Sequence, residues 1–434
     1  MLPDRLPMPK RLIDDCFFHD PNDAKRLSHD HAIQQLSERI QPVVSVGLEV
    51  LATAAGKIVA EDLCAPRSVP GHTNAAVDGY ALDFASLSPS TATSLQIRGR
   101  AAAGQPYTGK IGGGSACRIF TGAVMPSGCD TVVMQEDCEL SPDGAVVSIP
   151  AGIKTGANVR QAGEDVKNGD LLFRCGDILR PQDLAALASV GIEKVNCYQA
   201  PRVAVVSTGD EVLRVGHGEL SLGQVFDTNA PMLVELARLT GADVTDLGVW
   251  PDDAAVVEAN LADAAATYDV VLTSGGASLG EEDYMARSIE KLGVRHFWQI
   301  AVKPGRPLMF GQINETVIAG LPGNPVAVFV CFLLYVSPII RRLGGAHWRE
   351  PRRFKLPANF SVSNRKLGRR EFWRGITTAT EDGLKLDKFE RDGSGLISGL
   401  RAADCLIDVP EALPGVEPGQ LLDFIPFSEF GIRN

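Results

Sequence analysis

The chain has 434 residues, 45% of them hydrophobic, and 42 Lys and Arg against 53 Asp and Glu give a formal net charge of −11. The length suffices for roughly three domains, and the ordinary composition excludes disordered, fibrous and disulfide-stapled proteins. The acidity argues against a protein that coats nucleic acid, which needs a basic surface. Nine scattered cysteines without a Cys-x-x-Cys pair indicate reduced thiols. We find no export segment and no apolar run of about 20 residues, so we expect a cytoplasmic protein.

The first half of the chain predicts a β domain inserted into a helical region. After a tail (1–27), Ile33, Leu36 and Ile40 share one face at helical spacing, which predicts a helix over 30–40. A second helical stretch is expected near 47–58, and helical texture returns over 169–191. Between them, short β-branched runs alternate with Gly and Pro. The interpretation is an elongated helical domain built from two segments, with a β domain inserted between them: 28–62 and 166–199 for the helical domain, and 63–165 for the insertion.

The second half predicts a doubly wound α/β domain and a final β domain. Residues 200–345 alternate strands with helices; the expected strands are 203–206, 244–249, 269–273 and 316–319, and the expected helices are 230–239, 254–266, 284–292 and the stretch after Pro325. Residues 346–434 return to β texture, with strands expected at 360–362, 372–376 and 405–409. The predicted fold class is therefore multidomain α/β, with a central parallel or mixed sheet, an inserted β domain, a helical linker and a C-terminal β-barrel-like domain.

Four loops follow the carboxyl ends of the predicted parallel strands, where open α/β sheets bind ligands. They are residues 207–211, 250–253, 273–284 and 321–325. Turn chemistry explains any one of them alone, but four loops with small residues and carboxylates at one edge indicate a binding site. The candidate ligand-binding residues in them are Ser207, Thr208, Gly209, Asp210, Ser274, Gly275, Gly276, Ser278, Gly280, Pro322, Gly323, Asn324 and Pro325.

The loops suit an anion but not a Walker-type nucleotide site. Gly275 and Gly280 match the outer glycines of a P-loop, but Glu281 and Glu282 stand where Lys and Ser or Thr are required. The amides after Ser274 are still suited to an anion nest. In the last loop, Asn324 is expected to cap a helix whose N-terminus favours an anion, with a purely structural cap as the alternative.

Two basic features complement these loops. Lys303 and Arg306 lie on a proline-stiffened loop and favour a phosphate or oxyanion site over merely solvated charges. Residues 341–374 hold eleven Lys and Arg against two Glu, so this segment carries +9 and the remainder −20. A basic wall facing an anionic ligand is the functional interpretation, and a solvated hairpin face is the alternative.

Together these motifs resemble the molybdopterin molybdenumtransferase family, which includes the E domain of gephyrin. The resemblance runs from residue 28 to the C-terminus and is carried by residues 74–81, 160–165, 207–211, 227–229, 274–284, 303–307 and 321–325. It implies a reaction of adenylylated molybdopterin with molybdate that yields the metal-loaded cofactor and AMP and requires Mg²⁺. The catalytic positions carried over by motif are Asp78, Asp165, Glu211, Asp252 and Asp283, of which Glu211, Asp252 and Asp283 are the implied metal ligands. Lys303, Pro322 and Pro325 match the family's ligand-loop positions, and Arg369 or Arg370 and Ser394 fall in the matching C-terminal region.

The resemblance also implies an elongated homodimer, in which the inserted domain of one subunit, with Asp78 and Asp165, faces the α/β domain of the other. The implied protein partners are molybdopterin adenylyltransferase and molybdoenzyme chaperones. Neither nucleic acid nor a membrane is expected as a partner. In one departure, Gln299 follows Trp298 where many members have Lys, and Arg306 is expected to supply that charge. The alternatives are a molybdopterin adenylyltransferase, which is a single small α/β domain, and a non-catalytic scaffold, which does not need the acidic set.

Overall fold

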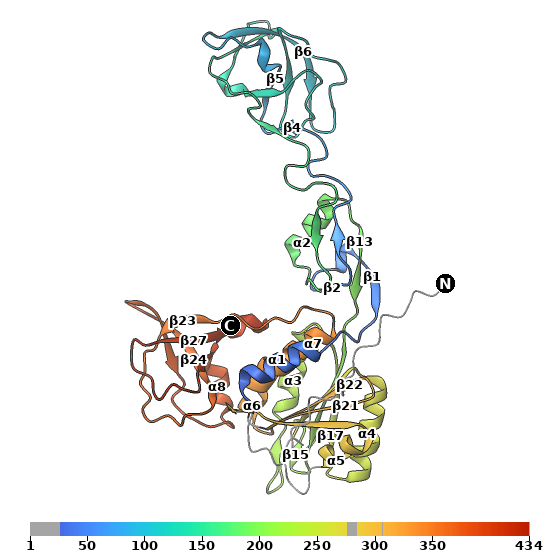
Figure 1. Ribbon diagram of the computed structural model, residues 1–434, viewed down its shortest axis with the longest axis vertical. Coiled ribbons are helices and arrows are strands. Elements are labelled where there is room, and N and C mark those ends of the chain that lie inside the picture. The colour runs from blue at the N-terminus through green and yellow to red at the C-terminus, as the bar shows by residue number, and fades with distance from the viewer. Residues whose placement is uncertain (1–26, 276–283, 306, 434) are drawn as a thin grey trace, which may run out of the picture.

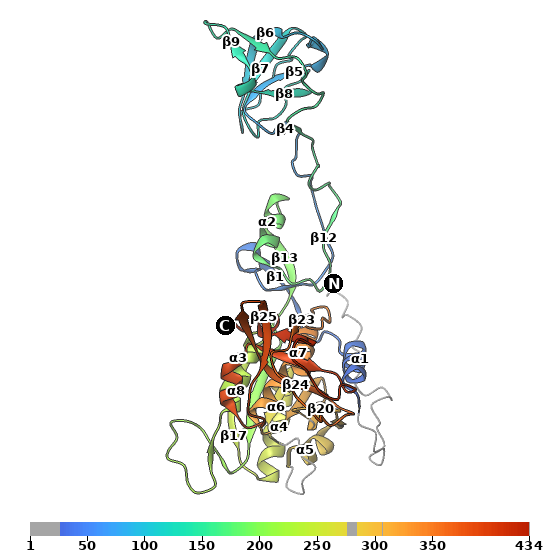
Figure 2. The ribbon, with the colours of Figure 1, turned by 90° about the vertical axis from the view of Figure 1, so that its left-hand side faces the viewer.

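The computed structural model describes residues 27–275, 284–305 and 307–433, which form an elongated molecule (Figure 1). A β-rich unit, residues 74–160, lies at one end. A narrow stem of short strands connects it to the other end, where the central sheet and a C-terminal β unit lie together. Figure 2, turned by 90°, shows the same separation of the β-rich unit from the central sheet.

The central sheet has six strands in the order β17-β14-β18-β22-β21-β19. The first four are parallel and the last two antiparallel. Their bounds are β14 (Arg202–Thr208), β17 (Asp243–Trp250), β18 (Val270–Ser274), β19 (Val294–Gln299), β21 (Pro307–Ile313) and β22 (Thr316–Leu321). The predicted parallel or mixed sheet is thus confirmed, with all four expected strands in its parallel part.

Helices cover both faces of this sheet. Val203 and Val205 pack on one face against α1 (His29–Arg39), α3 (Asn229–Arg238), α6 (Pro325–Cys331) and α7 (Ser337–Leu343). Ala204 and Val206 pack on the other against α4 (Ala254–Thr267) and α5 (Tyr284–Leu292). Burial on both faces explains why the strands are continuous apolar runs in the sequence.

The apolar helix after Pro325 is buried core, as its composition on all sides predicts. A π-helical turn, η4 (Phe332–Val336), joins α6 to α7, so that Pro325–Leu343 is one 19-residue helix. Length and hydropathy alone would allow it to cross a membrane, but 83% of its apolar window is buried inside the molecule. Pro338 has no amide to donate and its ring displaces the carbonyl one turn earlier, which accounts for the π turn.

The prediction of a helix near residues 47–58 is wrong. This segment forms β1 (Val46–Val50), the turn η1 (Leu51–Thr53) and β2 (Ile58–Val59), and both strands pair antiparallel with β13 (Lys194–Tyr198). Val46, Leu48 and Val50 alternate along the chain, which is the period of a strand. The helical texture of 169–191 reduces to α2 (Pro181–Ser189), and β12 (Leu171–Phe173) before it pairs with β3 (Leu63–Cys64). The linker is therefore mostly sheet rather than helical.

The β-rich unit is a six-stranded sheet with an apolar cluster on each face. Its strands, in the order β8-β5-β7-β6-β10-β9, are β8 (Thr131–Met134), β5 (Gly79–Leu82), β7 (Ser115–Ile119), β6 (Thr93–Ala101), β10 (Val146–Ile149) and β9 (Glu139–Leu140), with the turns η2 (Phe84–Ser86) and η3 (Gln135–Asp137). A small ribbon, β4 (Asn74–Ala75) with β11 (Val159–Arg160), closes the unit. Gly79 pairs with Ile119 and Met134, so the start of β5 and the ends of β7 and β8 share one edge.

The C-terminal β unit draws its first strand from the α/β part of the chain. Its sheet has the order β20-β24-β26-β27-β23, with β25 on β24; the elements are β20 (Val302–Lys303), β23 (Phe354–Pro357), β24 (Arg370–Thr380), β25 (Gly383–Lys388), α8 (Ile397–Ala402), β26 (Cys405–Val409), β27 (Leu421–Pro426) and η5 (Phe427–Phe430). The pairing of β20 with β24 sets Lys303 beside Glu371. The strand expected at 360–362 is wrong, since Val362 makes an isolated bridge to Val416.

Candidate functional site

Loops from four neighbouring parallel strands lie together at one edge of the central sheet. The register sets Ser207 beside Ser274, Thr208 beside Trp250, and Ser274 beside Leu321. All four strands run the same way, so the segments that follow them emerge at the same edge. The loops that the sequence singles out are therefore neighbours in space.

Exposed carboxylates occupy the β14 and β17 side of this edge. The amide of Asp210 donates to Oδ2 of Asp252 at 3.3 Å, and the amide of Asp252 donates to Oδ1 of Asp210 at 3.1 Å. Glu211 folds back over Gly209, whose φ of 127° suits glycine and where any Cβ would collide with the Glu211 carboxylate. A small parallel ribbon of β15 (Val212–Leu213) and β16 (Val225–Phe226) follows this loop. Two adjacent loops thus present three carboxylates to solvent, those of Asp210, Glu211 and Asp252.

The described residues contain no group of three His, Cys, Asp or Glu that could hold a metal ion by themselves. Of the three predicted metal ligands, Glu211 and Asp252 lie on adjacent loops, and Asp283 lies outside the described residues. The predicted ligand-binding residues Gly276, Ser278, Gly280 and Arg306 also lie outside them. Gly275 is the last described residue of its loop; its amide donates to the carbonyl of Leu321 at 3.1 Å, which ties two loops together.

A buried asparagine that sequence reasoning did not propose for the site joins two of the loops. Nδ2 of Asn229, at the start of α3, donates to Oγ of Ser274 and to the carbonyl of Gly323, both at 2.7 Å. Its Oδ1 and the Oγ of Ser207 are buried and find no hydrogen-bond partner among the described residues. Since such atoms are normally satisfied, they are candidates for hydrogen bonds to a bound ligand. The signal in the sequence was the acidic cap, Asp227, whose Oδ1 accepts the amide of Asn229.

We expect Asn229→Ala to loosen this edge. The variant loses both donated hydrogen bonds and removes the donor to the buried Ser274 hydroxyl, a loss of about 1–3 kcal/mol in the free energy of unfolding. Urea unfolding followed by tryptophan fluorescence measures this change. Asn196→Ala is the control, because Asn196 donates to Glu61 in an exposed pair of the stem. Equal stability of the two variants would contradict the role assigned to Asn229.

The N-terminus of α6 is completed by the C-terminal β unit. Asn324 stands at the N-cap position and Pro325 at the first helical position, as predicted, but the Asn324 side chain makes no capping hydrogen bond, so that part of the prediction is wrong. The amide of Val326 instead donates to the carbonyl of Ser394 at 2.9 Å. Ser394, far away in sequence, therefore does lie beside the Pro322–Pro325 loop.

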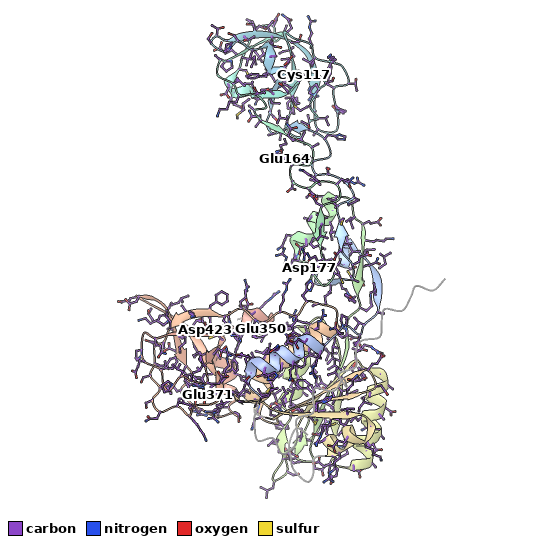
Figure 3. The ribbon with its side chains drawn as sticks, in the orientation of Figure 1. Cys117, Glu164, Asp177, Glu350, Glu371 and Asp423 are labelled. Carbon is purple, nitrogen blue, oxygen red and sulfur yellow. The ribbon has the colours of Figure 1, made fainter. Side chains whose placement is uncertain are left out.

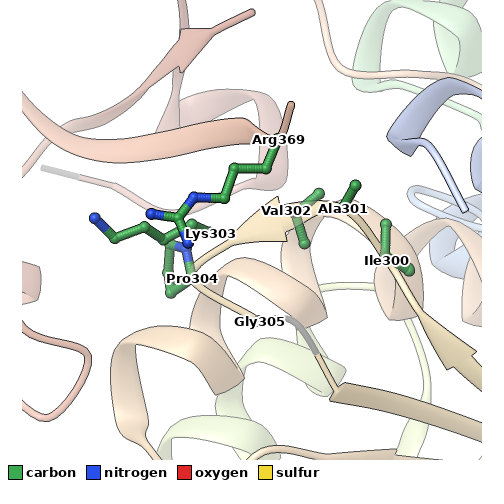
Figure 4. Close-up of a pocket in the computed structure, with 7 residues that line it drawn as sticks. All are labelled: Ile300, Ala301, Val302, Lys303, Pro304, Gly305 and Arg369. Carbon is green, nitrogen blue, oxygen red and sulfur yellow. The ribbon is translucent and has the colours of Figure 1, made fainter. Parts of the chain in front are cut away.

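A cavity of about 100 Å³ lies where the α/β part meets the C-terminal β unit (Figure 4). It is lined by residues 300–305 and Arg369, and the Lys303 and Arg369 side chains lie next to each other on one side of it. Gly305, with φ of 102°, holds this loop against α6, since a Cβ there would collide with Sγ of Cys331. Two neighbouring cations, Lys303 from this loop and Arg369 from the C-terminal β unit, suit a small oxyanion.

Glu371 organises the cations of this cavity. It is 3% exposed, accepts a 2.9 Å hydrogen bond from Trp373, and lies 3.6 Å from Lys303 Nζ and 3.2 Å from Arg369 Nε. Burial alone would raise the pKa of Glu371, but the Trp373 hydrogen bond and the charges of Lys303, Arg365 and Arg369 hold it below its ordinary value. The carboxylate is therefore charged and fixes the cations in place. Because three cations surround one carboxylate, the net charge at the cavity is positive.

The two candidate arginines have different environments. Arg369 lines the cavity, whereas Arg370 bonds the buried carboxylate of Asp408 at 2.6 Å and Asp30 of α1 at 2.8 Å. Of the two predicted residues, the structure therefore favours Arg369 for ligand binding and gives Arg370 a structural role between units.

Asp78 lies on the distant β-rich unit, and Asp165 lies just outside it, where the stem begins. Asp78 precedes β5, and its Oδ1 accepts hydrogen bonds from the amide and the hydroxyl of Thr121, both 2.7 Å, which lower its pKa. Asp165 is exposed. In Figure 3 its neighbour Glu164 is at the stem end of the β-rich unit, far from Glu371. Within one chain, these two predicted catalytic residues are therefore not brought to the central loops.

Comparisons with known proteins match the chain over most of its length. Three family models match: MoeA N-terminal region (domain I and II) over residues 27–191, a probable molybdopterin binding domain over 204–342, and MoeA C-terminal region (domain IV) over 358–427. The chain is 37% identical over 406 residues to a molybdopterin molybdenumtransferase of Haemophilus influenzae, covering 93% of this chain and 99% of that protein. A second relative of that name, from a Nostoc species, is 34% identical over 354 residues and covers 80% of each chain. The solved structure of the molybdopterin biosynthesis moeA protein from Pyrococcus horikoshii OT3 superposes with a TM-score of 0.80 at 27% identity, covering 93% of this chain and 100% of that one.

Proposed function

The chain belongs to the molybdopterin molybdenumtransferase family and is a transferase of molybdenum cofactor biosynthesis, and from that premise we propose how its residues share the reaction. Adenylylated molybdopterin binds along the edge of the central sheet, molybdate binds in the Lys303–Arg369 cavity, and AMP leaves as metal is inserted. The observation that carries this assignment is the division of the edge into an acidic side at β14 and β17 and a cationic cavity at β20.

The cationic cavity is suited to molybdate because its charges are fixed before the ligand arrives. Lys303 and Arg369 are already held near each other by Glu371, so little side-chain freedom is lost when an oxyanion binds. The loops at the carboxyl ends of β18 and β22 are proposed to hold the phosphates of the other substrate. The unpaired Ser207 hydroxyl and Asn229 carbonyl are proposed to orient its polar groups.

We propose Mg²⁺ as the metal cofactor, held by Glu211 and Asp252, with Asp283 as a third ligand. The donor set fits, because Mg²⁺ binds through one or two carboxylates and completes its shell with water and substrate phosphates. When bound, the ion neutralises charge on phosphate oxygens. The crossed hydrogen bonds between Asp210 and Asp252 hold the two acidic loops together for that purpose.

We propose that the working enzyme is a homodimer in the cytoplasm, in which Asp78 and Asp165 of one subunit meet the central loops of the other. Support comes from the stem, where Val46, Leu48 and Val50 of the edge strand β1 are 44%, 63% and 44% exposed. Three apolar side chains at alternate positions of an edge strand are a surface that proteins normally cover.

Replacement of Leu48 by Asp is expected to weaken the dimer. A charge placed in an apolar contact must be desolvated without a partner, so the equilibrium shifts toward monomer and activity falls with it. Sedimentation velocity across a concentration series measures the change. Leu421→Asp, on an equally exposed leucine (63%) of the C-terminal unit, is the control and should leave the association unchanged. Identical behaviour of both variants would remove β1 from the interface.

The function is tested by metal insertion in vitro. Purified protein receives adenylylated molybdopterin, Mg²⁺ and increasing molybdate, and AMP release is followed. We expect release to depend on molybdate and to fall at least about 10-fold in Lys303→Ala, mainly through a higher KM for molybdate.

Two outcomes would favour the alternative functions. Activity with molybdopterin plus ATP would favour the adenylyltransferase alternative, and full activity of Asp252→Ala in cells lacking the native protein would favour a scaffold. Molybdopterin adenylyltransferase and molybdoenzyme chaperones are the proposed protein partners.

A further inference from the structure

Two arginines face each other across neighbouring strands of the β-rich unit, on the edge that also carries Asp78. Arg100 of β6 is the register partner of Arg118 of β7. Their guanidinium carbons lie 4.8 Å and 4.7 Å from the centroid of the Phe120 ring. The Phe120 ring thus holds two like charges close together on adjacent strands, against their mutual repulsion.

The structure fixes the pair rather than letting it separate. Arg118 also stacks over Tyr80, at 5.0 Å from the ring centroid, donates at 3.0 Å to the carbonyl of Gly79, and donates to Gln135. These contacts use two of the five N–H groups of Arg118. A guanidinium held at several points is preorganised for a charged partner.

The pair lies beside a residue with a proposed catalytic role. Asp78 directly precedes Gly79, the residue that Arg118 bonds, and Thr121, which donates twice to Asp78, directly follows Phe120. A carboxylate alone would repel an anionic substrate from this edge. Two cations next to it neutralise that repulsion and still leave the carboxylate available to act.

We propose that Arg100, Phe120 and Arg118 form an anion-binding platform, which holds a phosphoryl group of the substrate beside Asp78. The inference rests on the proposed shared site, because the β-rich unit of a chain is far from its own central loops (Figure 1). It assigns the β-rich unit a binding function as well as a carboxylate. The ligand class is a phosphate ester or pyrophosphate, which planar guanidinium groups bind with paired hydrogen bonds.

Direct binding is measured with inorganic pyrophosphate and full-length protein, without catalysis. Lys303→Ala serves as the background, so that the remaining binding reports the platform. Arg100→Ala and Arg118→Ala are each expected to raise the Kd for pyrophosphate at least about 10-fold, and Arg98→Ala, an exposed arginine of the same strand, to leave it unchanged. Molybdate in place of pyrophosphate identifies the oxyanion, and tighter binding of molybdate than of pyrophosphate overturns the assignment to phosphate. Unchanged Kd values overturn the platform, and melting temperatures verify folding.

Mixed dimers separate this proposal from the shared site itself. A dimer of an Asp78→Ala chain and an Asp252→Ala chain has one site with both carboxylates intact. Arg118→Ala added to the Asp252→Ala chain, which supplies the working Asp78, is expected to raise the KM for adenylylated molybdopterin about 10-fold. The same change in the Asp78→Ala chain is expected to leave the KM unchanged. Equal effects in the two chains overturn the platform, whereas inactivity of the mixed dimer without Arg118→Ala overturns the shared site on which it rests.

Discussion

Replacing Asp408 by Ala is expected to lower the free energy of unfolding by about 3–5 kcal/mol, the largest stability loss we predict for a single side chain. Asp408 is 1% exposed on β26. It accepts bonds from Arg370 at 2.6 and 2.8 Å and from Arg353 at 2.8 Å. Its removal leaves two partly buried guanidinium groups without their counter-charge, and such a loss far exceeds that of an exposed pair.

This ion cluster also joins units of the molecule. Arg370 reaches Asp30 of α1, and the neighbouring His29 bonds the hydroxyl of Tyr335, inside the helix after Pro325, at 2.8 Å. The cluster thus connects the N-terminal helix, the α/β core and the C-terminal β unit. We therefore expect the variant to unfold at lower urea with tryptophan fluorescence as the probe. Asp382→Ala, which removes an 82% exposed carboxylate paired with Lys385, is the control and should leave the midpoint unchanged.

The pH dependence of Asp408→Asn provides a second measurement. Burial opposes the ionisation of Asp408, but the hydrogen bonds and charges of Arg370 and Arg353 outweigh it and hold the pKa below its ordinary value. The stabilising contribution is therefore complete above the unfolded-state pKa of about 3.9 and is lost as the pH falls through the lower folded-state pKa. The difference in unfolding free energy between wild type and Asp408→Asn should be constant from pH 7 to about 5 and shrink below about pH 4. A difference that grows toward low pH would contradict the charge state assigned here.

Wild type and Asp408→Asn also share an acid sensitivity that comes from His29 and is separate from Asp408. Burial, followed by the charge of Arg370, lowers the pKa of His29 to about 4, whereas the unfolded chain has an ordinary His pKa of about 6.5. The unfolded state then binds more protons between these values, so stability falls as the pH drops through this range. Comparison of wild type with Asp408→Asn at each pH removes most of this common contribution.

Sequence reasoning succeeded where one physical pattern dominated a segment. The strand Cys405–Val409 and the helix Tyr284–Leu292 have the bounds expected of them, because the strand is a buried apolar run and the helix has one clear apolar face. It failed in the stem, where Val46, Leu48 and Val50 alternate but remain exposed.

The candidate site was predictable to the extent that it depends on strand order. Loops after parallel strands must emerge together, so their neighbourhood follows from the sequence. Glu371 and Asn229 were missed because their importance arises from partners distant in sequence: Lys303 for the first, and Ser274 and Gly323 for the second. The capping expected of Asn324 failed for the same reason, since the carbonyl of Ser394 takes the first amide of the helix. Tertiary contacts decide such details, and local pattern does not contain them.

Mixing two inactive variants is expected to restore activity. Asp78→Ala and Asp252→Ala should each reduce AMP release by about 100-fold or more. This is the range for a positioned proton-transferring group in the case of Asp78, and Asp252→Ala removes a proposed Mg²⁺ ligand. If each site combines the β-rich unit of one subunit with the central loops of the other, a mixed dimer has one site with both changes and one with neither. The mixed dimer is obtained by co-expressing the two variants with different affinity tags and purifying on both tags in turn. Subunits therefore need not be unfolded and exchanged.

A site shared between subunits predicts how much activity the mixed dimer regains. One intact site in two gives about half the activity of wild type per purified mixed dimer, whereas sites formed within single chains would give none. Both substituted side chains are surface carboxylates whose removal leaves the cores intact, since Asp78 and Asp252 lie in loops at sheet edges. Asp78→Ala mixed with Asp78→Ala serves as the control and should remain inactive. Failure of the purified mixed dimer to release AMP would place both carboxylates outside a shared site, and the long stem would then need another function than carrying Asp78 to a second subunit.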